Sequence, residues 1–444
     1  MQKQQLSFFD LSMIVVSLVI GMGIFRTPVS VASVADSSAI FFLAWIIGGI
    51  TALCGALTFA EIGSRLPVSG GYYKIFSHSY HPAFAFMLNG TILISNAASV
   101  AGVALIGAEY ITPSLIPGSW TPEQDETHHL ILAVAMILLF FGLNLLGLKT
   151  SSRTLNVLTV FKLAVVVTLC LTIFYSHTEI KTVQEIVTGG PNGFLKSLGL
   201  CLIPISFTYG GYQQTINFGG EVDNAPRIMP RAIILGMIVV TILYLTINYA
   251  YIHIIGFTQL KTAQTIGQTL SAIIFGEVGG KIFSMLLFFS VLAYVNIGLL
   301  SNPRVIMAMS EESVLPKIFS KHSKRFNVPV WSLVAFTIVT IIVLFFAKTF
   351  DGLVNYVIFL DSTGFVFAAT TIFFLRAKKS GEEKPIYRSF LYPVLPSLFI
   401  LVYLLIALSV VLKDWIYPAI DCAVFAFFFL LYLVFNFKKK TNGN

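Results

Sequence analysis

Stretches of roughly 20 apolar residues recur along this chain, and each is long enough for an α-helix to cross about 30 Å of hydrocarbon. Hydrophobic residues make up 56% of the sequence and charged residues only 11%, whereas soluble domains carry about 25% charged residues. A chain with so few charges cannot cover a globular surface with polar groups, so it needs lipid as its solvent. We therefore expect an all-α polytopic membrane protein whose outer surface contacts membrane lipid.

Twelve segments meet the requirements of length and apolar composition for a membrane span. They are residues 10–34, 38–62, 83–111, 129–148, 155–176, 193–221, 229–254, 279–310, 329–347, 351–375, 389–411 and 415–437. Residues 65–81, between the second and third spans, are too polar to cross the membrane, and we expect them to lie along its surface.

The positive charges are distributed unevenly between the two sides that this order of spans defines. Lysines and arginines gather in the loops on the side that also holds both chain ends, which carry Lys3 and the run Lys438, Lys439 and Lys440. Loops rich in Lys and Arg remain in the cytoplasm. The sequence thus predicts cytoplasmic N- and C-termini in a multi-pass protein of a bacterial inner membrane. The same clustering accounts for the net charge of +8 without a nucleic-acid partner.

Two of the predicted spans are interrupted by glycine. The first contains Gly21 and Gly23, and the sixth contains Gly210 and Gly211. These spans occupy matching positions if residues 1–176 and 177–375 form two inverted five-helix repeats, with residues 376–444 adding two spans and a basic tail. Paired helix breaks at repeat-related positions indicate the binding site of a transporter. The alternative is that the glycines only let neighbouring helices pack closely.

A broken helix offers a solute the backbone groups that an intact helix keeps for itself. Amide donors are free where a helix begins, and carbonyl acceptors are free where it ends. This arrangement fits a zwitterion, whose carboxylate would bind amides at the start of the second half-helix and whose ammonium would bind carbonyls. The expected substrate contacts in the first span are Ile20, Gly21, Gly23 and Ile24. Those in the sixth span are Phe207, Thr208, Tyr209 and Gly210.

Four segments resemble motifs of one transporter family. They are residues 21–28 in the first span, 61–73 after the second, 221–232 after the sixth, and Arg304 with residues 315–316 and 328–329 after the eighth. In this order they resemble permeases of the amino acid–polyamine–organocation superfamily, over about residues 8–435. The resemblance implies the fold of the bacterial leucine transporter, a 5+5 inverted repeat with broken helices 1 and 6. Two C-terminal helices complete it.

Residues 207–212 resemble the sixth span of the L-type amino-acid transporter branch of this superfamily. The resemblance implies that Phe207 covers the bound substrate and that carbonyls just after it take the amino group. It also implies that Asn296, in the eighth span, contacts the substrate. Tyr212 stands where the branch usually has Trp. Residues 112–128 lack the cysteine that links animal L-type carriers to a glycoprotein, so we expect no disulfide-linked glycoprotein partner.

Lys162 lies about seven residues into the fifth span, or roughly 10 Å along the helix. Sodium-independent members of the superfamily carry a lysine in this span whose ammonium replaces a sodium ion of their relatives. The resemblance implies the same role for Lys162. The alternative is that the side chain extends to the inner surface of the membrane.

Arg26 and Asp361 are two further charges placed inside predicted spans, where an unpaired charge costs a few kcal/mol or more. Sodium-coupled relatives with this fold close an outer gate with an arginine of span 1 and an aspartate of span 10. The resemblance therefore implies an Arg26–Asp361 gate. Asp361 is open to two other interpretations, a hydrogen-bonded carboxylate that faces a water-filled vestibule and a proton carrier.

These observations favour sodium-independent transport of neutral L-amino acids by alternating access, with exchange as the mode. A proton-coupled symporter is the main alternative, and a polyamine or organic-cation carrier or a transporter-like membrane sensor is a weaker one. The sequence contains no nucleophile–base set, phosphate-binding loop or metal-ligand spacing. We expect neither an enzyme nor a cofactor.

Overall fold

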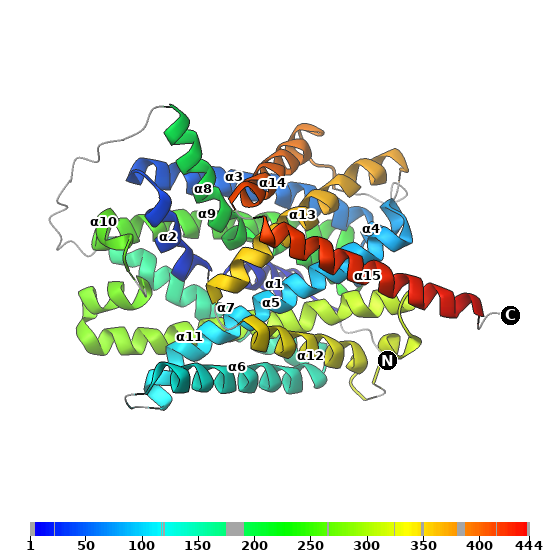
Figure 1. Ribbon diagram of the computed structural model, residues 1–444, viewed down its shortest axis with the longest axis horizontal. Helices are drawn as coiled ribbons and strands as arrows, with labels where there is room; N and C mark the ends of the chain where they lie inside the picture. Colours follow the sequence, from blue (N-terminus) through cyan, green and yellow to red (C-terminus); the bar gives the residue numbers. More distant parts are fainter. Residues whose placement is uncertain are drawn as a thin grey trace.

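The computed structural model describes residues 5–21, 23–116, 118, 120–174, 191–263, 266–323, 325–347, 350–379, 387–413 and 415–441. In these ranges the chain forms long helices, most of them running along the horizontal direction of Figure 1, and no strand. Eleven of the helices are long and apolar enough to cross a membrane. A shorter apolar segment, Val330–Phe346, lies where the ninth span is predicted. The all-α polytopic class is confirmed, while the count of twelve spans and the inverted repeat remain predictions.

The long helices follow the predicted spans in order. They are α1 (Phe8–Val19) with α2 (Gly23–Val34), α3 (Ser38–Arg65), α5 (Pro82–Leu115), α6 (Pro122–Leu145), α7 (Leu148–Leu171), α8 (Pro191–Tyr209), α9 (Ala225–Ile255), α11 (Ile266–Glu311), α12 (Val330–Ala347), α13 (Phe350–Ala377), α14 (Val394–Lys413) and α15 (Ile416–Thr441). The shorter elements are α4 (Gly71–Ser79), α10 (Phe257–Leu260) and the 3₁₀ helices η1 (Thr172–Phe174), η2 (Tyr212–Asn217), η3 (Gly219–Glu221) and η4 (Lys317–Ser320).

The start of α1 is set by a capping box. The Asp10 amide donates to Ser7 Oγ at 3.2 Å, and the Ser7 amide donates to Asp10 Oδ2 at 3.0 Å. These two bonds satisfy amides that the first turn of a helix leaves without partners. This end of the chain and the end of α15 lie on the same side of the bundle, as an even number of spans requires (Figure 1). Which side faces the cytoplasm remains a prediction.

The polar segment after α3 forms the short helix α4, but α4 does not simply rest on the membrane surface as we expected. Its aromatic residues Tyr72, Tyr73 and Phe76 are buried, because they face the bundle while the polar side chains face outward. Gly70 precedes the helix with a φ of +65°, and a Cβ there would lie 2.5 Å from the Arg304 carbonyl oxygen. The glycine therefore allows the loop to pack directly against α11.

Candidate functional site

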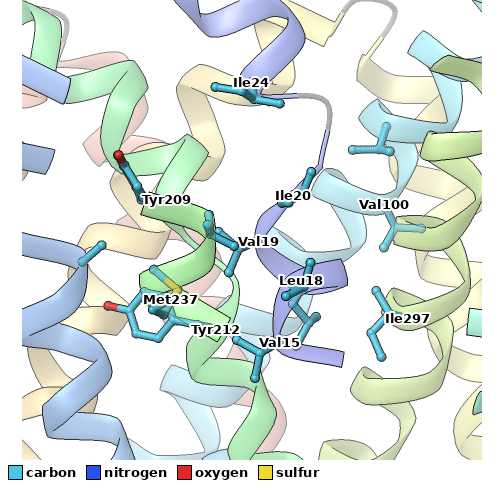
Figure 2. Close-up of a cluster of buried hydrophobic side chains, with 14 of the residues drawn as sticks. Val15, Leu18, Val19, Ile20, Ile24, Val100, Tyr209, Tyr212, Met237 and Ile297 are labelled. Atoms are coloured by element: carbon cyan, nitrogen blue, oxygen red, sulfur yellow. The ribbon is translucent and has the colours of Figure 1, made fainter. Parts of the chain in front are cut away.

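The first predicted helix break is present between α1 and α2. Helix α1 ends at Val19, and α2 begins at Gly23. The Gly21 amide turns back to donate to the Val19 carbonyl at 2.8 Å. The apolar side chains of Ile20 and Ile24 lie on either side of the interruption and are fully buried (Figure 2). The first amides of α2 therefore begin inside the bundle, where a helix N-terminus attracts an anion.

The second predicted break lies between α8 and η2. Helix α8 ends at Tyr209, and the chain continues beyond Gly210 and Gly211 as a 3₁₀ helix rather than as an α-helix. Gly211 has a φ of +111°, and a side chain there would collide with the backbone of Leu18. The break predicted at Gly210 and Gly211 is thus present, and the segment that follows it packs its backbone against the end of α1.

Two side chains hold the carbonyl ends of the broken helices. The Tyr244 hydroxyl, from α9, lies 2.9 Å from the Val19 carbonyl oxygen and 3.3 Å from the Thr208 carbonyl oxygen. Lys162 donates to the carbonyl oxygens of Ile20 and Ser17. Its side chain is only 1% exposed, so the ammonium does not extend to the membrane surface. A single tyrosine and a single lysine therefore fix both helix ends in relation to α9 and α7.

A cavity with about 490 Å³ of empty space, part of it open to solvent, lies between the two breaks. Its walls come from both broken spans and from α5, α11 and α13. The lining residues are Leu18, Val19, Gly21, Gly23, Asn96, Ser99, Val103, Phe207, Thr208, Gly210, Gly211, Gln213, Gln214, Tyr294 and Asp361. The predicted residues Gly21, Gly23, Phe207, Thr208, Gly210 and Asp361 are thus brought together.

Thr208 links the two broken spans beside this cavity. Its Oγ1 lies 2.7 Å from Thr27 Oγ1 of α2. A Cβ added at Gly23 would meet the same hydroxyl at 2.8 Å and the Thr208 methyl group at 3.0 Å. The absence of a side chain at Gly23 is therefore what lets α8 approach the start of α2.

Sequence reasoning missed the polar wall of the cavity, which consists of Asn96, Ser99, Gln213, Gln214 and Tyr294. Asn96, Ser99 and Val103 occupy one face of α5, at helical spacing. Polar residues in the middle of an apolar span were the available signal, because a polar side chain facing lipid would be costly. The two glutamines directly after the glycine pair gave a second signal of the same kind.

Other predicted contacts lie away from the cavity wall. The ring of Tyr209 packs between Trp45 and Tyr244, with ring centroids 5.8 and 5.1 Å away. Ile20 and Ile24 bury their side chains in the apolar cluster of Figure 2. With their side chains buried, these residues can offer a solute only their backbone amides and carbonyls. Backbone contacts are also what we predicted from the sequence for Ile20 and Ile24.

Asn296 is a contact between helices in this structure and not part of the cavity wall. Its Oδ1 accepts hydrogen bonds from Asn144 Nδ2 and Ser151 Oγ, each at 3.0 Å, and its Nδ2 donates to the Ser151 carbonyl oxygen at 3.1 Å. Asn296 therefore joins α11 to α6 and α7. Tyr294, two residues earlier on α11, lines the cavity instead.

Arg26 and Asp361 have other partners than each other in this conformation. An Arg26 guanidinium nitrogen lies 3.7 Å from a Glu109 carboxylate oxygen, and both side chains are about one-third exposed. Asp361 accepts a hydrogen bond from Ser95 Oγ at 2.5 Å. The Arg26–Asp361 gate stays a prediction that would require Arg26 to leave Glu109.

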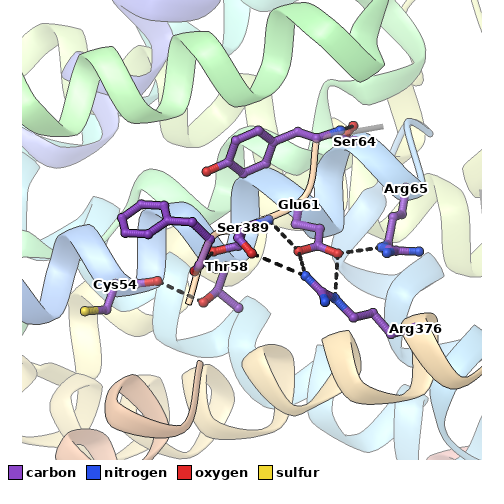
Figure 3. A network of polar contacts seen from close by, with 9 residues as sticks. Cys54, Thr58, Glu61, Ser64, Arg65, Arg376 and Ser389 are labelled. Carbon is purple, nitrogen blue, oxygen red and sulfur yellow. Dashed lines mark hydrogen bonds and ion pairs between the residues drawn. The ribbon is translucent and has the colours of Figure 1, made fainter. Parts of the chain in front are cut away.

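A buried charge network ties α3 to α13 and to the loop that follows α13 (Figure 3). Glu61 accepts hydrogen bonds from Arg65 Nε at 2.8 Å, from Arg376 Nη2 at 2.7 Å and from the Ser389 amide at 2.9 Å. Arg376 also stacks 3.6 Å from the centroid of the Tyr392 ring. The acid of the segment 61–73 thus anchors α13, the helix that carries Asp361.

One family profile and several known transporters match nearly the whole chain. The profile of the amino acid permease family matches residues 6–440. The serine/threonine exchanger SteT of Bacillus subtilis is 28% identical over 406 residues, which cover 90% of this chain and 89% of the exchanger. The b(0,+)-type amino acid transporter 1 of Mus musculus is 25% identical over 96% of this chain and 87% of its own length. The large neutral amino acids transporter small subunit 2 of Mus musculus is 27% identical over 89% of this chain and 75% of its own length.

Proposed function

Because the chain belongs to the amino acid permease family, whose members are membrane transporters and not enzymes, we propose that it carries neutral L-amino acids. In this proposal transport needs no sodium and proceeds by alternating access, as the exchange of one amino acid for another. The observation that carries the proposal is the cavity between the two helix breaks, which is lined by Gly21 and Gly23 from one break and by Gly210 and Gly211 from the other.

The substrate carboxylate binds at the start of α2. The first amides of a helix have no partner within it, and Gly23 exposes this backbone to the cavity. The helix dipole adds a favourable interaction with a negative group. A side chain at Gly23 would take up the space that the carboxylate needs.

The substrate ammonium binds carbonyl oxygens at the ends of α1 and α8. The carbonyl oxygens of Ile20 and Thr208 already accept one hydrogen bond, from Lys162 and from Tyr244 respectively, whereas that of Val19 already accepts two. A carbonyl oxygen has two lone pairs and can accept a second bond. The ammonium therefore joins acceptors that the protein has already fixed in position.

Lys162 makes sodium unnecessary in this proposal. Its ammonium lies at the broken end of α1 and occupies carbonyl oxygens of the kind that coordinate a monovalent cation. A fixed positive charge at this position supplies the positive charge that a bound sodium ion would supply.

In the same proposal Phe207 covers the bound substrate. Both chain ends face the cytoplasm of a bacterial cell.

Counterflow into proteoliposomes tests this function with the purified chain alone. Vesicles preloaded with a mixture of neutral L-amino acids should take up a labelled one equally well in sodium and in choline. Empty vesicles should take up far less. Uptake that depends strictly on sodium would contradict the role of Lys162, and failure without a second protein would contradict the expectation that no glycoprotein partner is needed.

Proton-coupled uptake is the second candidate, because Asp361 lines the cavity. If Asp361 carries the proton, Asp361→Asn should keep counterflow and lose accumulation driven by a pH gradient. Exchange without proton coupling predicts no accumulation by a pH gradient in the unmodified protein. The two candidates therefore separate in one pair of vesicle measurements.

A further inference from the structure

A row of buried amide side chains leads to the cavity, and its direction is set by a backbone carbonyl. Asn302 Nδ2 donates to the Gly298 carbonyl oxygen at 2.9 Å, and Asn302 Oδ1 accepts from Asn96 Nδ2 at 2.7 Å. Asn96 Oδ1 in turn accepts from Gln214 Nε2 at 2.9 Å. A carbonyl oxygen can only accept, so each amide in the row has one possible orientation.

This row ends in an acceptor that has no donor. Gln214 is 5% exposed, and its Oε1 is buried without a hydrogen-bond partner in the part of the chain that the structure describes. Leaving such an atom unpaired is unfavourable, because it loses the hydrogen bonds that water would give it. Turning the amide would not help, because it would point Oε1 at Asn96 Oδ1, a second acceptor.

Asp361 is another acceptor on the same wall. It lines the main cavity together with Gln214, and both residues also line a smaller adjoining cavity. Ser95 Oγ supplies one hydrogen bond to one carboxylate oxygen, whereas a carboxylate can accept about four. The wall therefore offers more acceptors than the described residues satisfy.

We propose that Asp361 and Gln214 form the side-chain subsite of the permease and select neutral amino acids whose short side chains donate a hydrogen bond, such as serine and threonine. The inference rests on the proposed function, since the helix breaks must hold the carboxylate and the ammonium. Both residues line the cavity that contains the breaks, and a hydroxyl or an amide close to Cα would supply a donor to this wall. An aliphatic side chain would bury both acceptors without a donor.

Isosteric amino acids test the subsite on the unmodified protein. Threonine and valine differ by a hydroxyl in place of a methyl group, and a site built to hydrogen-bond a hydroxyl strongly rejects the analogue that lacks it. Inhibition of labelled uptake should give threonine an inhibition constant at least about tenfold below that of valine. Serine should likewise have a lower inhibition constant than alanine.

Two variants then identify the residues. Gln214→Leu and Asp361→Leu should each bring the threonine-to-valine ratio towards one, because leucine has no acceptor, while Gln259→Leu, at an exposed position of α10, should leave it unchanged. An unmodified protein that binds valine as tightly as threonine, or lysine more tightly than either, would overturn the subsite while leaving amino-acid transport in place. A ratio unaffected by both variants would also overturn it. Failure of every α-amino acid to compete would instead reject the proposed function.

Discussion

Gly23 carries the strictest steric requirement in the site. It begins α2, lines the cavity and lies against the Thr208 side chain of α8. The close approach to Thr208 depends on the missing Cβ. The residue therefore joins the packing of two broken helices to the carboxylate site that we propose.

Replacing Gly23 by valine should abolish transport, with a loss of at least about tenfold in uptake. The new Cβ alone would lie 2.8 Å from Thr208 Oγ1, and a β-branched side chain cannot rotate away from this contact. Gly142→Val is the matched control, because a Cβ at Gly142 has nothing within 4 Å. Normal uptake by folded Gly23→Val protein would show that the carboxylate binds elsewhere.

Lys162→Met should also reduce uptake by about tenfold or more. Methionine keeps most of the apolar stem but leaves the buried carbonyls of Ile20 and Ser17 without their donor, at a cost of about 1–3 kcal/mol. The thermal unfolding temperature should fall as well. Lys317→Met, at an exposed position of η4, serves as the control. A variant with unchanged uptake would mean that the ammonium has no part in fixing α1.

Part of the site could be predicted from single residues, and part could not. The glycines were predictable because a break in an apolar span needs residues that tolerate unusual backbone geometry. Resemblance gives a span but not the face of the helix, and Asn296 bonds to Asn144 and Ser151 in this conformation while Tyr294, two residues earlier, lines the cavity. The acceptor at Gln214 depends on a hydrogen-bond row across three elements, which no local pattern reveals.

At the scale of elements, the two breaks depend on the helices that surround them. Tyr244 of α9 and Lys162 of α7 hold the carbonyl ends, and Glu61 of α3 holds α13 in place through Arg376. The sequence predicted the helices themselves well, since length and apolar content decide where a span can lie. It did not predict that the segment after Gly211 would be a 3₁₀ helix, because that form follows from contact with α1.

Removing Glu61 should destabilise the protein more than removing Arg376. Glu61→Ala removes the buried carboxylate that accepts hydrogen bonds from Arg65, Arg376 and the Ser389 amide, and breaking a buried ion pair in this way costs about 3–5 kcal/mol. Arg376→Ala leaves the Glu61–Arg65 pair intact. Thermal unfolding in detergent measures both, with Glu312→Ala as a control in a more exposed pair. Equal unfolding temperatures for the Glu61 and Arg376 variants would contradict the network.

The whole molecule is a bundle in which apolar faces meet lipid and a few polar groups meet at the centre. Exposed leucines and phenylalanines on α14 and α15, among them Leu404 and Phe427, are the outer surface that low charge content predicts. The central cavity is where the chain departs from this rule. In the proposed function these polar groups bind the solute, so sequence composition predicts the class of the protein but not its substrate.

The central claim is that both helix breaks hold one α-amino acid, and analogues that lack one of its two charged groups test it most directly. Competition against labelled threonine uptake should be strong for threonine and at least about tenfold weaker for both N-acetyl-threonine and the decarboxylated amine. The first lacks the ammonium that binds carbonyls, and the second lacks the carboxylate that binds the start of α2. An amine that competes as well as threonine would contradict the account, because α2 would then bind nothing.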